Sequence, residues 1–309
     1  MLADISWLYR KAIRRLAPFA APKLTRLAQH APKQLRLPRH RLKPPEFCPT
    51  FSIVTPSYQQ APFIERTIQS VLAQDYPKVE YIIIDGNSSD GTREILRRNE
   101  KSLAYWISEP DRGQSQAINK GFHRSTGEIM AYLNSDDLYL PGTLSYVATA
   151  FTENPELDVV YGHRIIIDEQ DFEIGRWIIP AHDAELLRWM DWIPQETLFW
   201  RRRAWDRIGA QLDESLQFAM DWDLISRFDR EGLKIKRLNR FLGAFRLHSS
   251  QKTLAEMSLT GEREIRMIRK RNLGRDVDEV EIRRRVFGYL FRHSMLDLCW
   301  RIGLIDMET

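Results

Sequence analysis

Short apolar runs alternate with helix-like segments through the middle of the chain. Residues 51–55, 79–84 and 129–133 are apolar runs of strand length, and 103–107 is a weaker one. Between them, apolar side chains recur every three or four residues. This spacing predicts a helix that begins near Pro62, followed by helices over about 91–99 and 114–124. Strands that alternate with helices form parallel sheets with right-handed crossovers, so the pattern predicts an α/β fold.

Polar and acidic residues follow the predicted strands directly. They occupy the segments 55–58, 85–90, 111–114 and 134–137. The carboxyl ends of parallel strands meet at one edge of a sheet, where ligands bind. We therefore expect these four segments to converge on a single cleft.

The adjacent carboxylates Asp136 and Asp137 follow the apolar run 129–133. Two neighbouring carboxylates repel each other and resist desolvation, so a cation is expected beside them. A divalent metal and an Arg/Lys cluster are both open on this pattern alone. Oxygen ligands suit Mg²⁺ or Mn²⁺, which would join an acid-rich cleft to a phosphate. The chain has neither a GxxxxGK[ST] P-loop nor a GxGxxG dinucleotide motif.

Composition narrows the class of protein. The 309 residues are 43% hydrophobic and 28% charged, as in an ordinary soluble globular protein. Cys48 and Cys299 have no CxxC or Cys/His spacing, so neither a disulfide scaffold nor a structural zinc site is expected. A reducing cytoplasm is the expected location. No apolar run approaches the ~18–20 residues of a membrane span, and the first residues lack a signal-peptide pattern.

Charge is distributed unevenly along the chain. Residues 1–45 contain four Lys and seven Arg against one acid, a net +10. Residues 46–309 carry the remaining 35 basic and 41 acidic residues, a net −6. Because the basic charge lies in a tail and not on the folded body, nucleic acid is not expected as a partner.

The first residues of this tail combine basic and apolar side chains. Trp7, Leu8, Ile13 and Leu16 recur at roughly helical spacing among arginines and lysines, and a proline-rich stretch follows. Two interpretations stay open. The segment is either a helix docked on the anionic inner face of a membrane or a solvated arm.

Three blocks of the chain resemble the inverting glycosyltransferases of family 2, which have the GT-A fold. The blocks are FSIVTPSYQQAPFIERTIQSVLAQDYPKVEYIIIDGNSSDGT, SEPDRGQSQAINKGFHRSTGEIMAYLNSDDLYLPGTL and FAMDWDLISRF. The resemblance implies a GT-A-type αβα sandwich with a mostly parallel central sheet, plus C-terminal helices. The expected divisions are a basic extension (1–45), a GT-A domain (46–250) with nucleotide-sugar and acceptor halves meeting near residue 140, and a helical region (251–309).

The resemblance also implies a nucleotide-sugar donor, with a UDP-sugar favoured, a divalent metal (Mn²⁺ or Mg²⁺) and a saccharide acceptor. Thr55, Pro56, Ser57 and Tyr58 match the family segment that cradles the base and ribose. Asp85 matches the carboxylate that hydrogen-bonds the base.

Three nearby residues extend this expected donor site. Asp90 belongs to the loop of Asp85, and Arg112 lies near where such enzymes approach the donor phosphates. Gln116 stands where many relatives carry an acid, which leaves the donor sugar and base open. Simpler roles are also open, because Asp85 and Asp90 suit a turn and Arg112 suits a surface ion pair.

The expected metal site follows the third strand. Asn134-Ser135-Asp136 occupies the DxD position of the family, with Asp136 as the metal ligand and Asp137 supporting the sugar or the metal. Asn134 replaces the first Asp of that motif, so one charged ligand is missing. His248 matches a position that completes the metal shell in some relatives. The alternatives are a helix cap at Asp136 and Asp137, and a loop histidine at His248.

Sugar transfer needs a carboxylate that accepts the proton of the attacking hydroxyl, and a metal that neutralises the departing diphosphate. Asp221 matches the catalytic base of the family. Met220 stands where the family usually has an acid, and Asp223 is the neighbouring alternative base. Asp221 also suits the cap of a helix over about 221–231.

Two aromatic or basic regions follow. The Trp-rich region 182–207 reads mainly as core, although the segment 192–197 resembles the acceptor-side loop of the family, in which Trp192 would stack on a sugar. Residues 255–302 read as two basic helices that form a cap or a dimer face, or that contact a membrane bearing a lipid-linked acceptor.

These observations predict a metal-dependent inverting glycosyltransferase that acts on a glycan or lipid-linked saccharide in cell-surface polysaccharide synthesis. Two alternatives remain. A nucleotidyltransferase would carry a Gly-rich phosphate loop with a Lys near its first strand, which residues 55–60 lack. A non-catalytic saccharide-binding protein would lack Asp136 and Asp221, and both are present. Oligomeric state, acceptor and linkage stay undetermined by the sequence.

Overall fold

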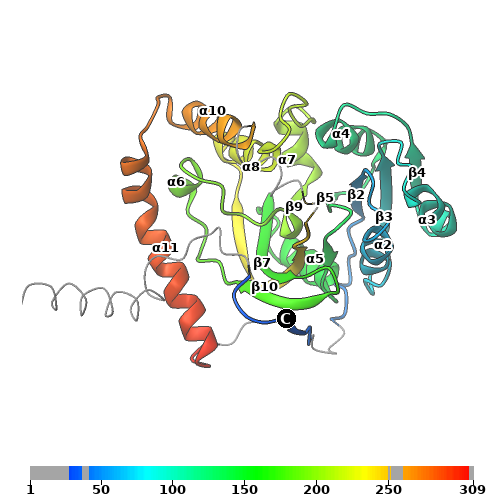
Figure 1. Cartoon of the computed structure of the whole chain (residues 1–309), viewed down its shortest axis with the longest axis horizontal. Helices are drawn as coiled ribbons and strands as arrows, with labels where there is room; N and C mark the ends of the chain where they lie inside the picture. Colours follow the sequence, from blue (N-terminus) through cyan, green and yellow to red (C-terminus); the bar gives the residue numbers. More distant parts are fainter. Residues whose placement is uncertain (1–27, 37–41, 250, 252–259, 306–309) are drawn as a thin grey trace, which may run out of the picture.

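A single mixed sheet with helices on both faces forms the body of the protein (Figure 1). The computed structural model describes residues 28–36, 42–249, 251 and 260–305. In these residues the sheet has ten strands in the order β1-β8-β7-β9-β5-β2-β3-β4, and β10 pairs with β7 and β6. The amphipathic segment expected around Trp7 lies outside the described residues.

The half of the sheet expected to bind a nucleotide is parallel throughout. β2 pairs in parallel with β3 and β5, and β3 pairs in parallel with β4. The predicted alternation of strands and helices, and with it the α/β fold, is confirmed. The elements are β2 (Phe51–Ser57), α2 (Ile64–Leu72), β3 (Val79–Asp85), α3 (Thr92–Asn99), the 3₁₀ turn η1 (Glu100–Ser102), β4 (Tyr105–Ser108), α4 (Gln114–Arg124) and β5 (Ile129–Tyr132).

The second half of the sheet is mixed. β9 runs antiparallel between β5 and β7, and β10 runs parallel to β7. The first described residues join this half, because β1 (Lys33–Gln34) pairs with β8. The other elements are β6 (Leu138–Tyr139), α5 (Thr143–Glu153), β7 (Val159–Ile167), β8 (Phe172–Trp177), α6 (Ala184–Leu187), the 3₁₀ turn η2 (Gln195–Thr197), β9 (Phe199–Arg201), α7 (Arg202–Arg207), α8 (Met220–Arg230) and β10 (Ile235–Arg246).

Both faces of the central strands are buried, which explains why these strands read as unbroken apolar runs. Alternate residues of β2 point to opposite faces, so Val54 packs in the cluster that contains α4 and α8, and Ile53 packs in the cluster that contains α2 and α5. Helix α4 lies very close to β2, since a Cβ on Gly121 would fall 2.5 Å from Cγ1 of Val54. These contacts hold the strand ends, and the loops that follow them, in place.

The predicted C-terminal helices are α10 (Glu262–Leu273) and α11 (Glu279–Arg301). The carboxylate of Glu264 is buried and accepts the backbone N–H groups of Gln217, Phe218 and Ala219 at 2.9, 2.8 and 3.0 Å. These three residues lead directly into α8, so α10 fixes the start of that helix. No described helix is both long enough and apolar enough to cross a bilayer.

We expect Glu264→Ala to lower the free energy of unfolding by about 2–4 kcal/mol, because three buried N–H groups lose their acceptor. Glu262→Ala is the matched control. Glu262 lies two residues before Glu264 in the same helix and is exposed. Its replacement by Ala should change the free energy of unfolding by no more than about 0.5 kcal/mol. Urea unfolding of both variants measures the difference, and equal effects would contradict this role of Glu264.

Candidate active site

A cavity of about 890 Å³ opens at the carboxyl ends of β2, β3 and β5. The strand-end segments predicted to converge all contribute to its wall, together with residues from the start of α8. The sequence-predicted site residues that line it are Pro56, Ser57, Tyr58, Asn134, Ser135, Asp136, Asp137 and Asp221. The structure therefore brings the expected metal ligand and the expected base into one cavity.

Asp136 and His248 face each other at this site. Nε2 of His248 lies 2.9 Å from Oδ2 of Asp136, and the His248 ring packs against Phe63 with 4.4 Å between ring centroids. An imidazole nitrogen beside a carboxylate is a donor set that suits Mn²⁺. The described residues contain no group of three or more His, Cys, Asp or Glu that would hold a metal alone. A cation here would thus draw its other ligands from water or from substrate phosphates, as Mg²⁺ commonly does.

Asp137 has a mainly structural environment, although it also lines the cavity. Its Oδ1 accepts the backbone N–H of Arg246 at 3.0 Å, which joins the end of β10 to the segment after β5. Burial raises the pKa of the Asp137 carboxyl, and the neighbouring Asp136 raises it further. Helix α5 begins at Thr143 after Gly142, so neither carboxylate is its cap.

Two predicted donor-site residues, Thr55 and Asp85, lie behind the cavity wall instead of in it. Thr55 is buried against the Tyr81 hydroxyl. Asp85 is fully buried, and its oxygens accept the N–H and hydroxyl of Ser88 and the hydroxyl of Ser108. Asp85 organises the loop whose next residues, Gly86 and Asn87, do line the cavity.

Asp90 has a similar loop-building role. It accepts the N–H of Ala61 at 2.9 Å and the N–H and hydroxyl of Thr92. Although partial burial opposes ionisation, these hydrogen bonds leave the pKa of Asp90 below its ordinary value. The turn interpretation of Asp85 and Asp90 therefore describes their contacts in this structure. Asp111, which the sequence did not single out, lines the cavity nearby.

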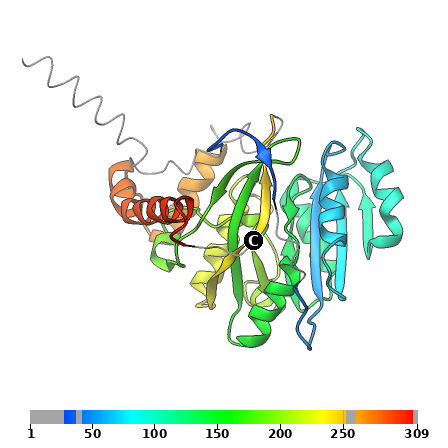
Figure 2. The same ribbon diagram turned by 90° about the horizontal axis from the view of Figure 1, so that it is seen from below.

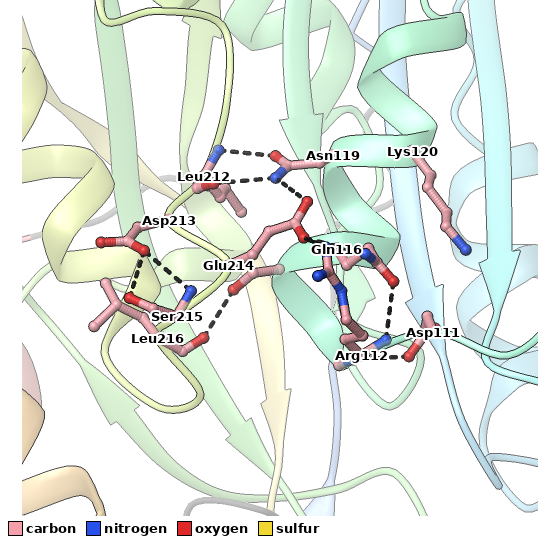
Figure 3. Close-up of polar contacts among 12 residues, drawn as sticks. Asp111, Arg112, Gln116, Asn119, Lys120, Leu212, Asp213, Glu214, Ser215 and Leu216 are labelled. Carbon is pink, nitrogen blue, oxygen red and sulfur yellow. Dashed lines mark hydrogen bonds and ion pairs between the residues drawn. The ribbon is translucent and has the colours of Figure 1, made fainter.

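Arg112 is exposed and lies outside the cavity wall. Its guanidinium pairs with Glu214 at 2.6 Å (Figure 3). Gln116 and Asn119 donate to the same carboxylate, at 3.1 Å each. Hydrogen bonding, first from Asn119, lowers the pKa of Glu214. This cluster ties α4 to the loop that leads toward α8, and it gives Gln116 and Arg112 a bridging position between the two halves of the domain.

Asp221 lies in the first turn of α8, where its Oδ1 accepts the N–H of Trp222 at 2.9 Å. Burial raises the pKa of its carboxyl. The alternative base, Asp223, is buried outside the cavity wall and pairs with Arg227 and Arg271. Of the two carboxylates, Asp221 is the one that faces the cavity.

Asp191 is a cavity residue that the sequence analysis missed. Its side chain is exposed, but it lines the cavity, so its access to water runs through that space. The surrounding protein raises the pKa of Asp191, and the nearby Asp221 raises it further. Asp191 directly precedes Trp192 in a region whose sequence predicts core packing. Its position next to that tryptophan was the only sequence feature that could have indicated a cavity residue.

A buried ion pair forms another wall of the cavity. Nε of Arg164 donates to Glu196 at 2.8 Å, and a second guanidinium nitrogen contacts the other carboxylate oxygen. The Arg164 guanidinium lies over the rings of Trp177 and Phe245, at 5.0 and 4.5 Å from their centroids. The Glu196 carboxylate therefore already accepts two hydrogen bonds from Arg164 in this structure.

Trp192 both lines the cavity and packs in the core. Its ring lies 4.8 Å from that of Tyr289 and 5.7 Å from that of Tyr161. Gln195 donates to the carbonyl of Tyr132, and Thr197 is buried against Gly162. The core interpretation of the Trp-rich region is therefore supported, with Trp192 as a residue that serves both environments.

An α/β sheet with an acid-lined cavity at its carboxyl edge is the arrangement of the GT-A glycosyltransferases. The model for Glycosyl transferase family 2 matches residues 52–212. The chain belongs to that family.

Two curated relatives carry this similarity. An uncharacterized glycosyltransferase of Mycobacterium tuberculosis strain H37Rv is 39% identical over 185 residues, which cover 58% of this chain and 68% of the relative. The "Putative teichuronic acid biosynthesis glycosyltransferase TuaG" of Bacillus subtilis strain 168 is 42% identical over 92 residues, which cover 29% of this chain and 36% of TuaG.

Two solved structures share the fold. Residues 1–349 of S. aureus TarS with UDP-GlcNAc superpose with a TM-score of 0.60 at 17% identity, covering 79% of this chain and 72% of that one. The mannosyltransferase PcManGT of Pyrobaculum calidifontis, with GDP-Man and Mn²⁺, has a TM-score of 0.57 at 17% identity, covering 95% and 86%. Identities this low establish the fold alone.

The raised pKa of Asp221 gives a prediction for stability. Between the unfolded pKa and this raised pKa the folded protein binds more protons, so stability falls as pH rises through that window. Asp221→Asn should therefore melt above the parent protein at pH 8, with a difference that shrinks toward pH 4. Thermal unfolding of the metal-free protein across this range measures it.

Asp213→Asn is the control with the opposite sign. The Ser215 hydroxyl lowers the pKa of Asp213, so its carboxylate stabilises the fold above the unfolded pKa, and that stability is lost as pH falls through the folded pKa. This variant should melt below the parent at pH 8. A lower melting temperature for Asp221→Asn at pH 8 would contradict the prediction.

Proposed function

We propose that this chain is a metal-dependent inverting glycosyltransferase that moves one sugar from a nucleoside-diphosphate sugar, with UDP favoured, to a saccharide acceptor. One observation carries the proposal. Asp136, whose carboxylate contacts His248, and Asp221, which forms no ion pair with the described residues, both line the cavity at the carboxyl edge of the sheet. The first is suited to hold a divalent cation and the second to accept a proton.

The donor end of the cavity is formed by the loops after β2 and β3. Ser57 ends β2 and Tyr58 follows it, and Gly86 and Asn87 follow β3, so residues from two strand ends would surround a nucleoside there. Asp136 and His248 would hold Mn²⁺ or Mg²⁺ against the diphosphate. When bound, the cation would neutralise charge on the departing group. The nucleotide sugars bound to TarS and PcManGT support this donor class and leave the base open.

Asp221 is the residue suited to general-base catalysis. The acceptor hydroxyl oxygen forms a bond to the anomeric carbon as the bond to the diphosphate breaks on the opposite side, which inverts the configuration. The hydroxyl proton passes to the Asp221 carboxylate. Its raised pKa makes Asp221 a stronger proton acceptor than an ordinary aspartate. The cavity holds donor and acceptor together, which removes much of the entropic barrier of a bimolecular reaction.

Asp191 and Trp192 lie in the wall near Asp221 and are suited to bind the acceptor. A carboxylate accepts hydrogen bonds from sugar hydroxyls, and an aromatic face packs on a sugar ring. The name of TuaG places that relative in teichuronic acid biosynthesis, which supports an acceptor in cell-surface polysaccharide synthesis for this chain. A bacterial envelope glycan is the acceptor class we infer.

Binding of UDP with Mn²⁺ tests the proposal directly. At 100 times its dissociation constant, UDP should stabilise the protein by about 2.7 kcal/mol and change the fluorescence of Trp177 and Trp192 in the cavity wall. Asp136→Asn should weaken Mn²⁺ binding about tenfold or more. Asp206→Asn, at an exposed position outside the cavity wall, is the matched control. No stabilisation or fluorescence change with any of UDP, GDP or dTDP would refute a nucleotide site.

Transfer by Asp221→Asn tests the base. We expect the transfer rate to fall about 10²–10⁴-fold while UDP affinity changes less than about twofold, because the amide keeps the shape and loses the proton acceptor. A screen of UDP-, GDP- and dTDP-sugars supplies the substrate for this assay. Asp223→Asn should lose stability, since Arg227 and Arg271 lose their partner, yet keep transfer. Normal turnover by Asp221→Asn would move the base elsewhere.

A further inference from the structure

Helix α11 is apolar on two opposite faces. Its inner face packs on the body of the protein through Val286, Tyr289 and His293, all buried. Its outer face carries large apolar side chains that stay exposed, spaced seven, four, four and seven residues apart along one side of the helix. These residues, the outer stripe, are Val280, Phe287, Phe291, Met295 and Ile302, with exposed fractions from 39 to 61%.

The position of α11 leaves the outer stripe uncovered by the described part of the chain. The helix runs along one edge of the molecule in Figure 1 and lies outside the sheet and its helices in the turned view of Figure 2. A single exposed apolar side chain is ordinary, but a row of this length on one helix face indicates a contact surface.

Charge around the outer stripe favours an anionic partner. Helix α11 contains five arginines, and four of them form ion pairs, with Glu279, Glu185, Asp183 and Asp297. Arg284 lies within the stripe, is exposed, and forms no ion pair with the described residues. Long arginine side chains pack their aliphatic part on apolar surface and extend their charge outward, which is the arrangement of helices that lie in a membrane interface.

The start of the described chain lies at the C-terminal end of this helix. The side-chain oxygen of Gln29 accepts a hydrogen bond from Arg301 at 3.3 Å, and the Gln29 backbone N–H donates to Ile174. The 27 residues before the described chain contain six Lys or Arg and one acid, with Trp7 and Phe19 among them. A strongly basic segment is therefore attached beside the end of the outer stripe.

The inner face of α11 contacts the wall of the cavity. Tyr289 packs on Trp192 with 4.8 Å between ring centroids, and His293 packs on Trp177 at 6.4 Å. Both tryptophans line the cavity. One helix thus has its inner side on the candidate active site and its outer side on an exposed apolar and cationic surface.

We propose that the outer stripe of α11, together with the basic residues at the start of the chain, docks the protein on an anionic phospholipid bilayer. Phe287 and Phe291 enter the headgroup boundary, and arginines and lysines contact lipid phosphates. Stable attachment of this kind needs both an apolar and an electrostatic component, and the chain contains both: the outer stripe on α11 and the basic sequence of residues 1–27. The docking places the cavity beside the membrane, where a lipid-linked saccharide is presented; that last step rests on the proposed function.

Co-sedimentation of the full chain with vesicles tests the proposal. The parent protein should bind vesicles of equal parts phosphatidylcholine and phosphatidylglycerol, and bind phosphatidylcholine vesicles at least about tenfold less. Phe287→Ser with Phe291→Ser should reduce binding to the anionic vesicles about fivefold or more. Phe47→Ser is the matched control, because Phe47 is 63% exposed but lies against Lys78, beside β3. That variant should bind like the parent.

A second variant isolates the electrostatic component. Arg10, Lys11, Arg14 and Arg15 replaced together by Ser should lower binding to anionic vesicles about tenfold and leave the weak binding to phosphatidylcholine unchanged. Raising the salt concentration should have the same effect on the parent. Melting temperature and UDP–Mn²⁺ binding of every variant show that the fold and the cavity are intact.

Two outcomes would overturn the docking surface. If the parent and the double Phe variant bind anionic vesicles equally well, the membrane contact does not lie on the outer stripe. The second outcome is a parent protein that does not bind vesicles but forms dimers, together with a double Phe variant that is monomeric. That result would show that the outer stripe binds a second copy of the chain and not a membrane. The proposed function fails separately: a protein that binds vesicles but no nucleotide would keep the docking surface and lose the transferase site.

Discussion

Crowding of carboxylates around one cavity is the constraint on which the site depends. Asp136, Asp137, Asp191, Glu196 and Asp221 all line it, and Arg164 is the one Lys or Arg among its described lining residues. Glu196 and two aromatic rings hold the Arg164 guanidinium. Its positive charge therefore compensates the negative charge of the neighbouring carboxylates from a fixed position. Burial raises the pKa of the Asp137, Asp191 and Asp221 carboxyls, and the neighbouring carboxylates raise these pKa values further. A divalent cation would relieve this crowding of negative charge, which is why an acid-rich cavity suits a metal–diphosphate pair.

The Asp221 carboxylate, which lines the cavity, is positioned from outside the segment that the family model matches. The family match ends at residue 212, whereas Asp221 lies beyond it, and Glu264 of α10 holds the three backbone N–H groups that precede α8. On the donor side, Glu214 connects α4 to the same approach loop. Both clusters use a carboxylate to satisfy N–H donors, so helices α10 and α4 constrain the start of α8, and with it Asp221, from two directions.

Local patterns predicted the parallel half of the sheet well. Apolar runs and helical spacing gave β2, β3, β5 and α4, and the rule that parallel strands end at one edge placed Asp136 in the cavity. Asp221, in the first turn of α8, was predicted only by the family resemblance. Side-chain direction was harder to predict. Asp85 and Asp90 turn into their own loop because Ser88, Thr92 and Ala61 offer hydrogen bonds there, which composition alone does not distinguish from ligand binding. Arg164 and Asp191 were missed because their roles come from contacts with residues distant in sequence.

The side-chain directions along helix α11 were also hard to predict from sequence. A helix with one apolar face is recognised from sequence by its periodicity, but apolar residues on opposite faces cancel that signal. The structure resolves the two sets: one side carries Tyr289 and His293 onto Trp192 and Trp177, and the other leaves Phe287 and Phe291 exposed. The cavity wall and the exposed row therefore lie on the two sides of one helix. The membrane attachment and the acceptor binding proposed above would act on opposite faces of α11, with only the thickness of that helix between them.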